Sequence, residues 1–131
     1  MNSRMTPEAL TAALAQFTGT EHYYAYWGGL THLTEGVQFL AKEARCFWLL
    51  DVICSYQADL AKHADTRLHE MQFWKLKVND DKSAVVTCVA DGDEPPAITQ
   101  QIEWTDFPLP EIRIWVGSEG ERKIALLPSE Y

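Results

Sequence analysis

The spacing of the apolar residues changes near the middle of this 131-residue chain, and this change constrains the fold more than any other feature. Up to about Lys62 the apolar residues recur at helical spacing, and from Gln72 onward they alternate with polar residues, as in half-buried strands. With 47% hydrophobic residues, a chain of this length has enough apolar surface for one core. We therefore predict a single globular domain over residues 1–131, of the α+β class, in which helices precede a sheet.

The first half of the chain contains several helical patterns. Thr6 and Pro7 are typical of the cap and the first position of a short amphipathic helix. A turn or two of aromatic helix is expected over residues 22–27. A longer helix follows the cap residue Thr34, and its segment Cys46–Cys54 is apolar on nearly all sides. We expect that segment to be the buried central helix.

The second half reads as four or five short strands joined by tight turns. The expected strands cover residues 72–78, 84–89, 98–104, 111–116 and 124–127. Strands with such short connections pair antiparallel with their neighbours. The sequence thus predicts N-terminal helices packed on one face of a four- to five-stranded antiparallel meander. Six large side chains are expected to be mostly buried: Trp48, Leu50, Ile53, Trp74, Ile102 and Ile114.

The three cysteines have the spacing of reduced, buried thiols. Cys46 and Cys54 lie about 12 Å apart if they share one helix, which is too far for a disulfide, and Cys88 lies alone in a strand. We expect a cytoplasmic protein without a signal peptide and without a membrane-spanning segment.

The net charge of −8 argues against a surface that binds phosphates, because such surfaces need clustered Lys and Arg. Direct nucleic-acid binding is therefore not expected. Between Ser83 and Ile112 the chain has no Lys or Arg and carries six acids, namely Asp91, Asp93, Glu94, Glu103, Asp106 and Glu111. This stretch is either a working surface for a partner with a basic surface or a solvated face.

Alternation over residues 111–116 places Arg113 and Trp115 with Glu111 on the face opposite Ile112 and Ile114. An exposed Trp beside an Arg is typical of a contact hot spot between proteins. The alternative is that N-terminal segments cover this second face. We include Arg113 and Trp115 with the six acids as candidate partner-binding residues.

Asp51 is the polar exception within the apolar segment Cys46–Cys54. An unpaired buried carboxylate is costly, so we expect a buried structural Asp51 that hydrogen-bonds to backbone or to a tyrosine hydroxyl. The alternative is a general base with a raised pKa, with His22 or Tyr56 near it.

The sequence contains no strong metal or cofactor motif. His63, Asp65 and His69 lie in one polar connection, where we expect exposed side chains rather than metal ligands. The cysteines lie in apolar settings, which do not favour a nucleophilic thiolate. No catalytic residue, metal or cofactor is expected.

Five sequence blocks resemble a bacterial family of small proteins classed only as a domain of unknown function. They are FTGTEHYY from Phe17, FWLLD from Phe47, FWKL from Phe73, TDFPL from Thr105 and LLPSEY from Leu126. The resemblance runs from Phe17 to Tyr131 and leaves the N-terminal helix unmatched. It implies an intracellular bacterial protein, carried in some members on plasmids or phages, and it brings no catalytic residue.

Three functions follow as expectations. The first is a non-catalytic, acidic module that binds a protein. The second is a phage- or plasmid-type inhibitor that mimics nucleic-acid charge to block a basic protein involved in defence. The third is a small enzyme that uses Asp51.

Overall fold

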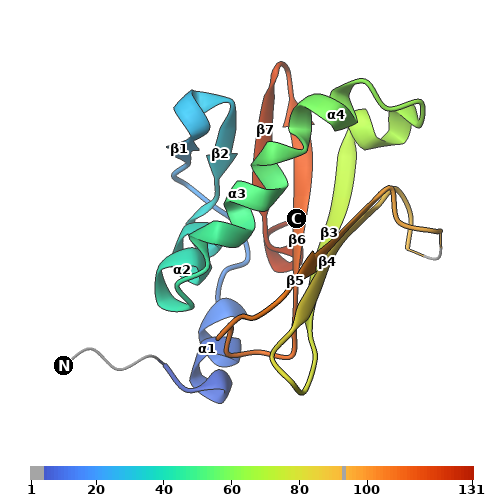
Figure 1. Ribbon diagram of the computed structural model, residues 1–131. Coiled ribbons are helices and arrows are strands. Elements are labelled where there is room, and N and C mark those ends of the chain that lie inside the picture. Colours follow the sequence, from blue (N-terminus) through green and yellow to red (C-terminus); the bar gives the residue numbers. More distant parts are fainter. Residues whose placement is uncertain (1–4, 93) are drawn as a thin grey trace.

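Helices occupy much of the first half of the chain and long strands the second half, so the α+β class is confirmed (Figure 1). The computed structural model describes residues 5–92 and 94–131. The helices are α1 (Pro7–Leu14), α2 (Glu35–Glu43), α3 (Phe47–Ser55) and α4 (Gln57–Ala61), and the 3₁₀ turns are η1 (Trp27–Gly29), η2 (Thr66–His69) and η3 (Pro128–Glu130). The strands are β1 (Tyr24–Tyr26), β2 (Thr31–Leu33), β3 (Met71–Val78), β4 (Ala84–Val89), β5 (Ile98–Ile102), β6 (Glu111–Glu119) and β7 (Arg122–Leu126).

The described strands form one seven-stranded sheet in the order β1-β2-β7-β6-β3-β4-β5. All neighbours pair antiparallel except β2 and β7, which are parallel. The prediction of a four- to five-stranded antiparallel meander is therefore wrong in size and in connection. The sheet is larger and mixed, and β6 pairs with β3 instead of following β5 at the edge.

The two strands that the sequence pattern missed are β1 and β2. Each has only three residues, which is too short for apolar alternation to be visible. The turn between them is made by Trp27, Gly28 and Gly29, all with positive φ (51°, 68° and 89°). This left-handed backbone reverses the chain and replaces the aromatic helix expected over residues 22–27.

The predicted helix starts are confirmed by their hydrogen bonds. The Thr6 hydroxyl accepts a bond from the Ala9 N–H at 3.1 Å, and the Thr34 hydroxyl accepts one from the Val37 N–H at 3.3 Å. The long helix expected after Thr34 is interrupted, because Arg45 has a φ of 54° and separates α2 from α3. Because α3 has one solvent-facing side, it is not buried all round.

The core lies between α2, α3 and one face of the sheet (Figure 1). Of the six side chains expected to be buried, Leu50, Ile53, Trp74 and Ile114 are buried, while Trp48 and Ile102 are half-buried. Within the described residues, no helix combines the length and the apolar composition that a bilayer crossing requires.

One polar network lies within this core, centred on Gln72, which is 1% exposed. Its side-chain amide exchanges two hydrogen bonds of 2.9 Å with the amide of Gln57, and its oxygen also accepts from the Trp74 indole N–H at 2.9 Å. Because the buried amide is hydrogen-bonded in this way, the cost of its desolvation is offset, and the network ties α4 to β3.

The C-terminal segment of the chain lies at the start of α2. Glu130 Oε1 accepts from the Thr34 hydroxyl at 2.6 Å and from the Leu127 N–H at 2.9 Å, and Glu130 Oε2 accepts from the Gly36 N–H at 3.1 Å. A Cβ at Gly36 would lie 2.7 Å from Glu130 Oε1 and from Leu127 Cδ1, so only glycine permits this approach. The carboxylate thus occupies the positive end of the helix.

Replacing Glu130 by Ala is expected to lower the free energy of unfolding by about 1–2 kcal/mol, because helix α2 loses a side-chain acceptor at its first turn. Urea denaturation of the full chain measures the change. Ser129→Ala, at an exposed neighbouring position, is the matched control and should leave stability nearly unchanged. Equal effects of the two substitutions would contradict the role of Glu130.

Candidate functional site

The face of the sheet opposite α2 and α3 carries a mixture of aromatic, aliphatic and cationic side chains. Alternation along β3 directs Gln72, Trp74 and Leu76 into the core and leaves the residues between them on this open face. The strand register adds side chains from β4 and β6 to the same face. They are Phe73, Lys75 and Lys77 of β3, Val85, Thr87 and Val89 of β4, and Glu111, Arg113 and Trp115 of β6.

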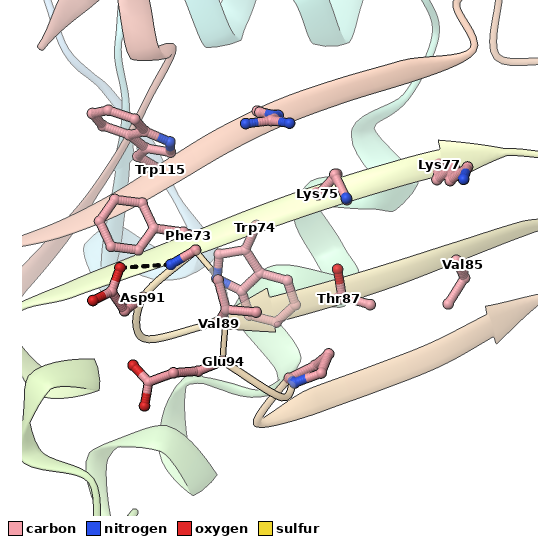
Figure 2. Close-up of a pocket in the computed structure, with 13 residues that line it drawn as sticks. Phe73, Trp74, Lys75, Lys77, Val85, Thr87, Val89, Asp91, Glu94 and Trp115 are labelled. Atoms are coloured by element: carbon pink, nitrogen blue, oxygen red, sulfur yellow. Dashed lines mark hydrogen bonds between the residues drawn. The ribbon is translucent and has the colours of Figure 1, made fainter.

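A hollow of about 520 Å³ lies over these strands and under the loop that follows β4. This volume falls within the range of ligand pockets. Figure 2 shows Phe73 and Trp115 at one end, with Lys75 and Lys77 farther along β3. Its described lining is Phe73, Trp74, Lys75, Lys77, Val85, Thr87, Val89, Asp91, Gly92, Glu94, Pro96, Arg113 and Trp115.

The aromatic end of the hollow is held by ring-to-ring contacts. The ring centroids of Trp115 and Phe73 are 5.2 Å apart at an interplanar angle of 86°, and those of Trp115 and Tyr131 are 5.4 Å apart at 69°. Edge-to-face geometry of this kind orients the rings. The half-buried ring of Trp115 is therefore held in a defined orientation by its neighbours, while Tyr131 beside it is 80% exposed.

The cationic end brings like charges together. Lys75 lies directly opposite Arg113 in the β3–β6 register and opposite Thr87 in the β3–β4 register. Like charges in directly opposed positions destabilise a sheet. One position along, Lys77 lies opposite Glu111, which is a favourable pairing.

The acidic rim of the hollow is engaged with its own partners. Both Nη groups of Arg67 donate to the Glu94 carboxylate at 2.7 Å, and Asp91 Oδ1 accepts from the Gly92 N–H at 2.7 Å. Arg67 also binds Asp65, and these side-chain hydrogen bonds lower the pKa of Asp65 to about 2. The loop after β4 is thereby attached to η2.

The candidate acids do not gather on one surface. Asp91 and Glu94 line the hollow together with Arg113 and Trp115. Glu103, Asp106 and Glu111 follow β5 and therefore lie toward its other end, as the course of the chain in Figure 1 shows. Glu111 accepts a hydrogen bond from Arg113 Nε at 3.0 Å. Asp93 lies outside the described residues.

Asp51 differs from its prediction in burial. Its side chain is exposed, so the expectation of a buried Asp51 is wrong. The reason is that α3 presents one side to solvent and Asp51 lies on it. Asp51 Oδ1 accepts from the Tyr26 hydroxyl at 2.7 Å and from the Trp27 indole N–H at 3.0 Å, which joins α3 to the edge strand β1 and the turn after it. Neither His22 nor Tyr56 is its hydrogen-bond partner; Tyr56 donates its hydroxyl to Gln100.

The cysteines are buried, and His63 and His69 lie within hydrogen-bond distance of backbone atoms. All three cysteines are buried thiols outside any disulfide. Burial raises the pKa of Cys88 to about 12 and raises that of Cys54. Asp65 donates its backbone N–H to His63 Nδ1 at 3.0 Å, while His69 Nε2 lies 3.1 Å from the His63 carbonyl. Among the described residues, no group of three or more His, Cys, Asp or Glu side chains is placed to hold a metal ion.

Comparison with known proteins places the chain in a family. A family model described as "Family of unknown function (DUF6876)" matches residues 8–131. The chain belongs to this family. The match includes nearly all of α1, the helix that the resemblance by sequence blocks left out. Neither the curated proteins nor the solved structures that were searched contain a match.

Family membership brings no site, so the hollow rests on geometry alone. The predicted partner-binding residues Asp91, Glu94, Arg113 and Trp115 line the hollow, whereas Phe73, Lys75 and Lys77 were not predicted. The signal was present, because alternation over residues 72–78 separates these three from the core side chains. The sequence pattern did not reveal the pairing of β3 with β6, which brings the side chains of β3 next to Arg113 and Trp115.

Replacing Lys75 by Glu is expected to raise the free energy of unfolding by about 0.2–1 kcal/mol, because it converts the like-charged pair with Arg113 into an opposite-charged pair. The matched control is Lys77→Glu, which faces Glu111 and should lower stability by a similar amount. Denaturant melts at low salt measure both. Changes of the same sign in the two variants would contradict the register argument.

Burial and the hydrogen bond to Asp51 raise the pKa of the Tyr26 hydroxyl above its ordinary value near 10. The folded protein therefore holds this proton more tightly than the unfolded chain. The resulting stabilisation is complete below about pH 10 and is lost as the pH rises through the pKa of the folded state.

The difference in unfolding free energy between wild type and Tyr26→Phe is therefore expected to shrink above about pH 10. Urea melts from about pH 8 to about pH 11 measure it. Tyr23→Phe, which removes a hydroxyl from an exposed tyrosine, is the matched control. A constant difference for Tyr26→Phe would contradict the coupling to Asp51.

Proposed function

We propose that this chain is a non-catalytic module that binds a protein partner through the open face of its sheet. The observation that carries the proposal is the hollow, in which Phe73 and Trp115 lie beside Lys75 and Arg113. Aromatic residues and Arg are enriched at the energetic centres of protein interfaces. Here they come from adjacent strands of a sheet, which holds them in fixed positions before any partner arrives.

The open face also has the mixture of groups that a specific interface needs. Its apolar side chains can lose water when a partner binds, and its cationic side chains can donate hydrogen bonds that fix the orientation of the partner. Because the rings of Phe73, Trp115 and Tyr131 already contact one another, little side-chain freedom remains to be lost on binding.

The other two expected functions find less support in the geometry. A mimic of nucleic-acid charge needs its acids on one surface, whereas the described candidate acids lie toward both ends of β5, and Glu94 and Glu111 are bonded to arginines. A basic surface on the partner stays a prediction that concerns those acids. Asp51 Oδ1 accepts hydrogen bonds from two aromatic side chains, which favours a structural role for Asp51 over a catalytic one.

Photocrosslinking tests which face contacts the partner. Benzoylphenylalanine in place of Thr87, on the open face, is expected to give a discrete adduct in cells that naturally express the protein. The same group in place of Ala58, exposed on α4, should give none. Trp115→Ala should weaken the Thr87 adduct, since loss of an aromatic anchor speeds dissociation. Adducts from Ala58 but not from Thr87 would overturn the proposal.

A further inference from the structure

The register of the open face arranges its side chains in two neighbouring rows. One row is apolar and runs across four strands through Leu126, Trp115, Phe73 and Val89. The next row contains Arg113, Lys75 and Thr87. The hollow therefore has an apolar end and a cationic end on the same strands.

Within the described residues, the cationic row is only partly neutralised. Among the described residues, Lys75 and Lys77 form no side-chain hydrogen bond or ion pair, and Arg113 donates only its Nε–H, to Glu111. Yet the whole chain carries a net charge of −8. The described acids thus leave Lys75 unpaired and engage only the Nε–H of Arg113 opposite it, which is the arrangement expected of an anion-binding position.

Neither of the described rim carboxylates, Asp91 and Glu94, fills this position. Figure 2 shows Asp91 beside Phe73 and Glu94 below Val89, away from Lys75 and Lys77. Glu94 is held by Arg67 and Asp91 by the Gly92 N–H. The cationic end is thus open to a carboxylate from outside, and hydrogen bonds to two cationic side chains would bind it strongly.

Resting on the proposed function, we propose that the partner inserts a segment with an acidic side chain about 7 Å from a bulky apolar side chain. The spacing is that of Phe73 and Lys75, which are two residues apart on one strand. The apolar side chain packs against Phe73, Trp115 and Val89, while the carboxylate lies between Lys75 and Arg113. An extended segment with these side chains at positions i and i+2 has this spacing.

Two synthetic peptides test the preference for an acid. The first is acetyl-Ser-Trp-Ser-Glu-Ser-amide, and the second has Gln in place of Glu. Each is titrated into the ¹⁵N-labelled full chain at low salt. We expect the Glu peptide to shift amide signals of β3, β4 and β6 and to bind about tenfold more tightly than the Gln peptide, with affinity that falls as salt is added.

Variants locate the carboxylate. Lys75→Met keeps the apolar stem of the side chain and removes its charge, so the preference for Glu over Gln should fall severalfold. Lys62→Met, at an exposed lysine at the end of α4, is the matched control and should keep the full preference. Removing one of two opposed cations relieves repulsion, so loss of binding by Lys75→Met cannot be attributed to unfolding.

Several results would overturn this inference. They are equal affinities for the two peptides, no shifts at all, shifts confined to the helices, or tighter binding of oligothymidylate or of a Lys-containing peptide. If these occur while the Thr87 crosslink persists, the open face binds a partner of other chemistry and the proposed function stands. If the crosslinks come from Ala58 instead, the proposed function itself fails.

Discussion

The hydrogen bonds of the Glu130 carboxylate at the start of α2 connect the helical half of the chain to the strand half, and the placement of α2 depends on this connection. The carboxylate joins the segment after β7 to the cap residue Thr34. Thr34 directly follows β2, the strand that pairs in parallel with β7. Gly36 permits the approach because it has no side chain. These contacts set α2, and α3 after it, over one face of the sheet, so that the opposite face stays open.

The two faces of the sheet differ in how far their polar and charged side chains are paired. On the covered face, polar groups such as those of Gln72, Gln57 and Trp74 are mutually satisfied. On the open face, Lys75 lies opposite Arg113 and has no acidic partner among the described residues, although the chain has 19 Asp and Glu residues. A local arrangement that costs stability, next to fixed aromatic rings, supports our proposal that this face binds a partner.

Several acids that are prominent in the sequence serve the fold. Asp51 fastens the turn after β1 to α3 through Tyr26 and Trp27, and Glu94 fastens the loop after β4 to η2 through Arg67. Their effect is to hold exposed segments in place around the sheet. The acid excess of the chain therefore does not by itself indicate the face that we propose for binding.

The sequence by itself determined the class of the fold, the helix caps at Thr6 and Thr34, and the side of each long strand that faces the core, because these depend on local spacing. Only the tertiary structure decided the parallel pairing of β2 with β7, the return of β6 to β3, and the solvent exposure of Asp51. Pairing joins residues far apart in the chain, and three-residue strands leave no periodic pattern. The candidate site depends on that pairing. Alternation places Trp115 and Arg113 on one side of β6, and it places Phe73 and Lys75 on one side of β3. Only the β3–β6 register shows that these two sides form one surface.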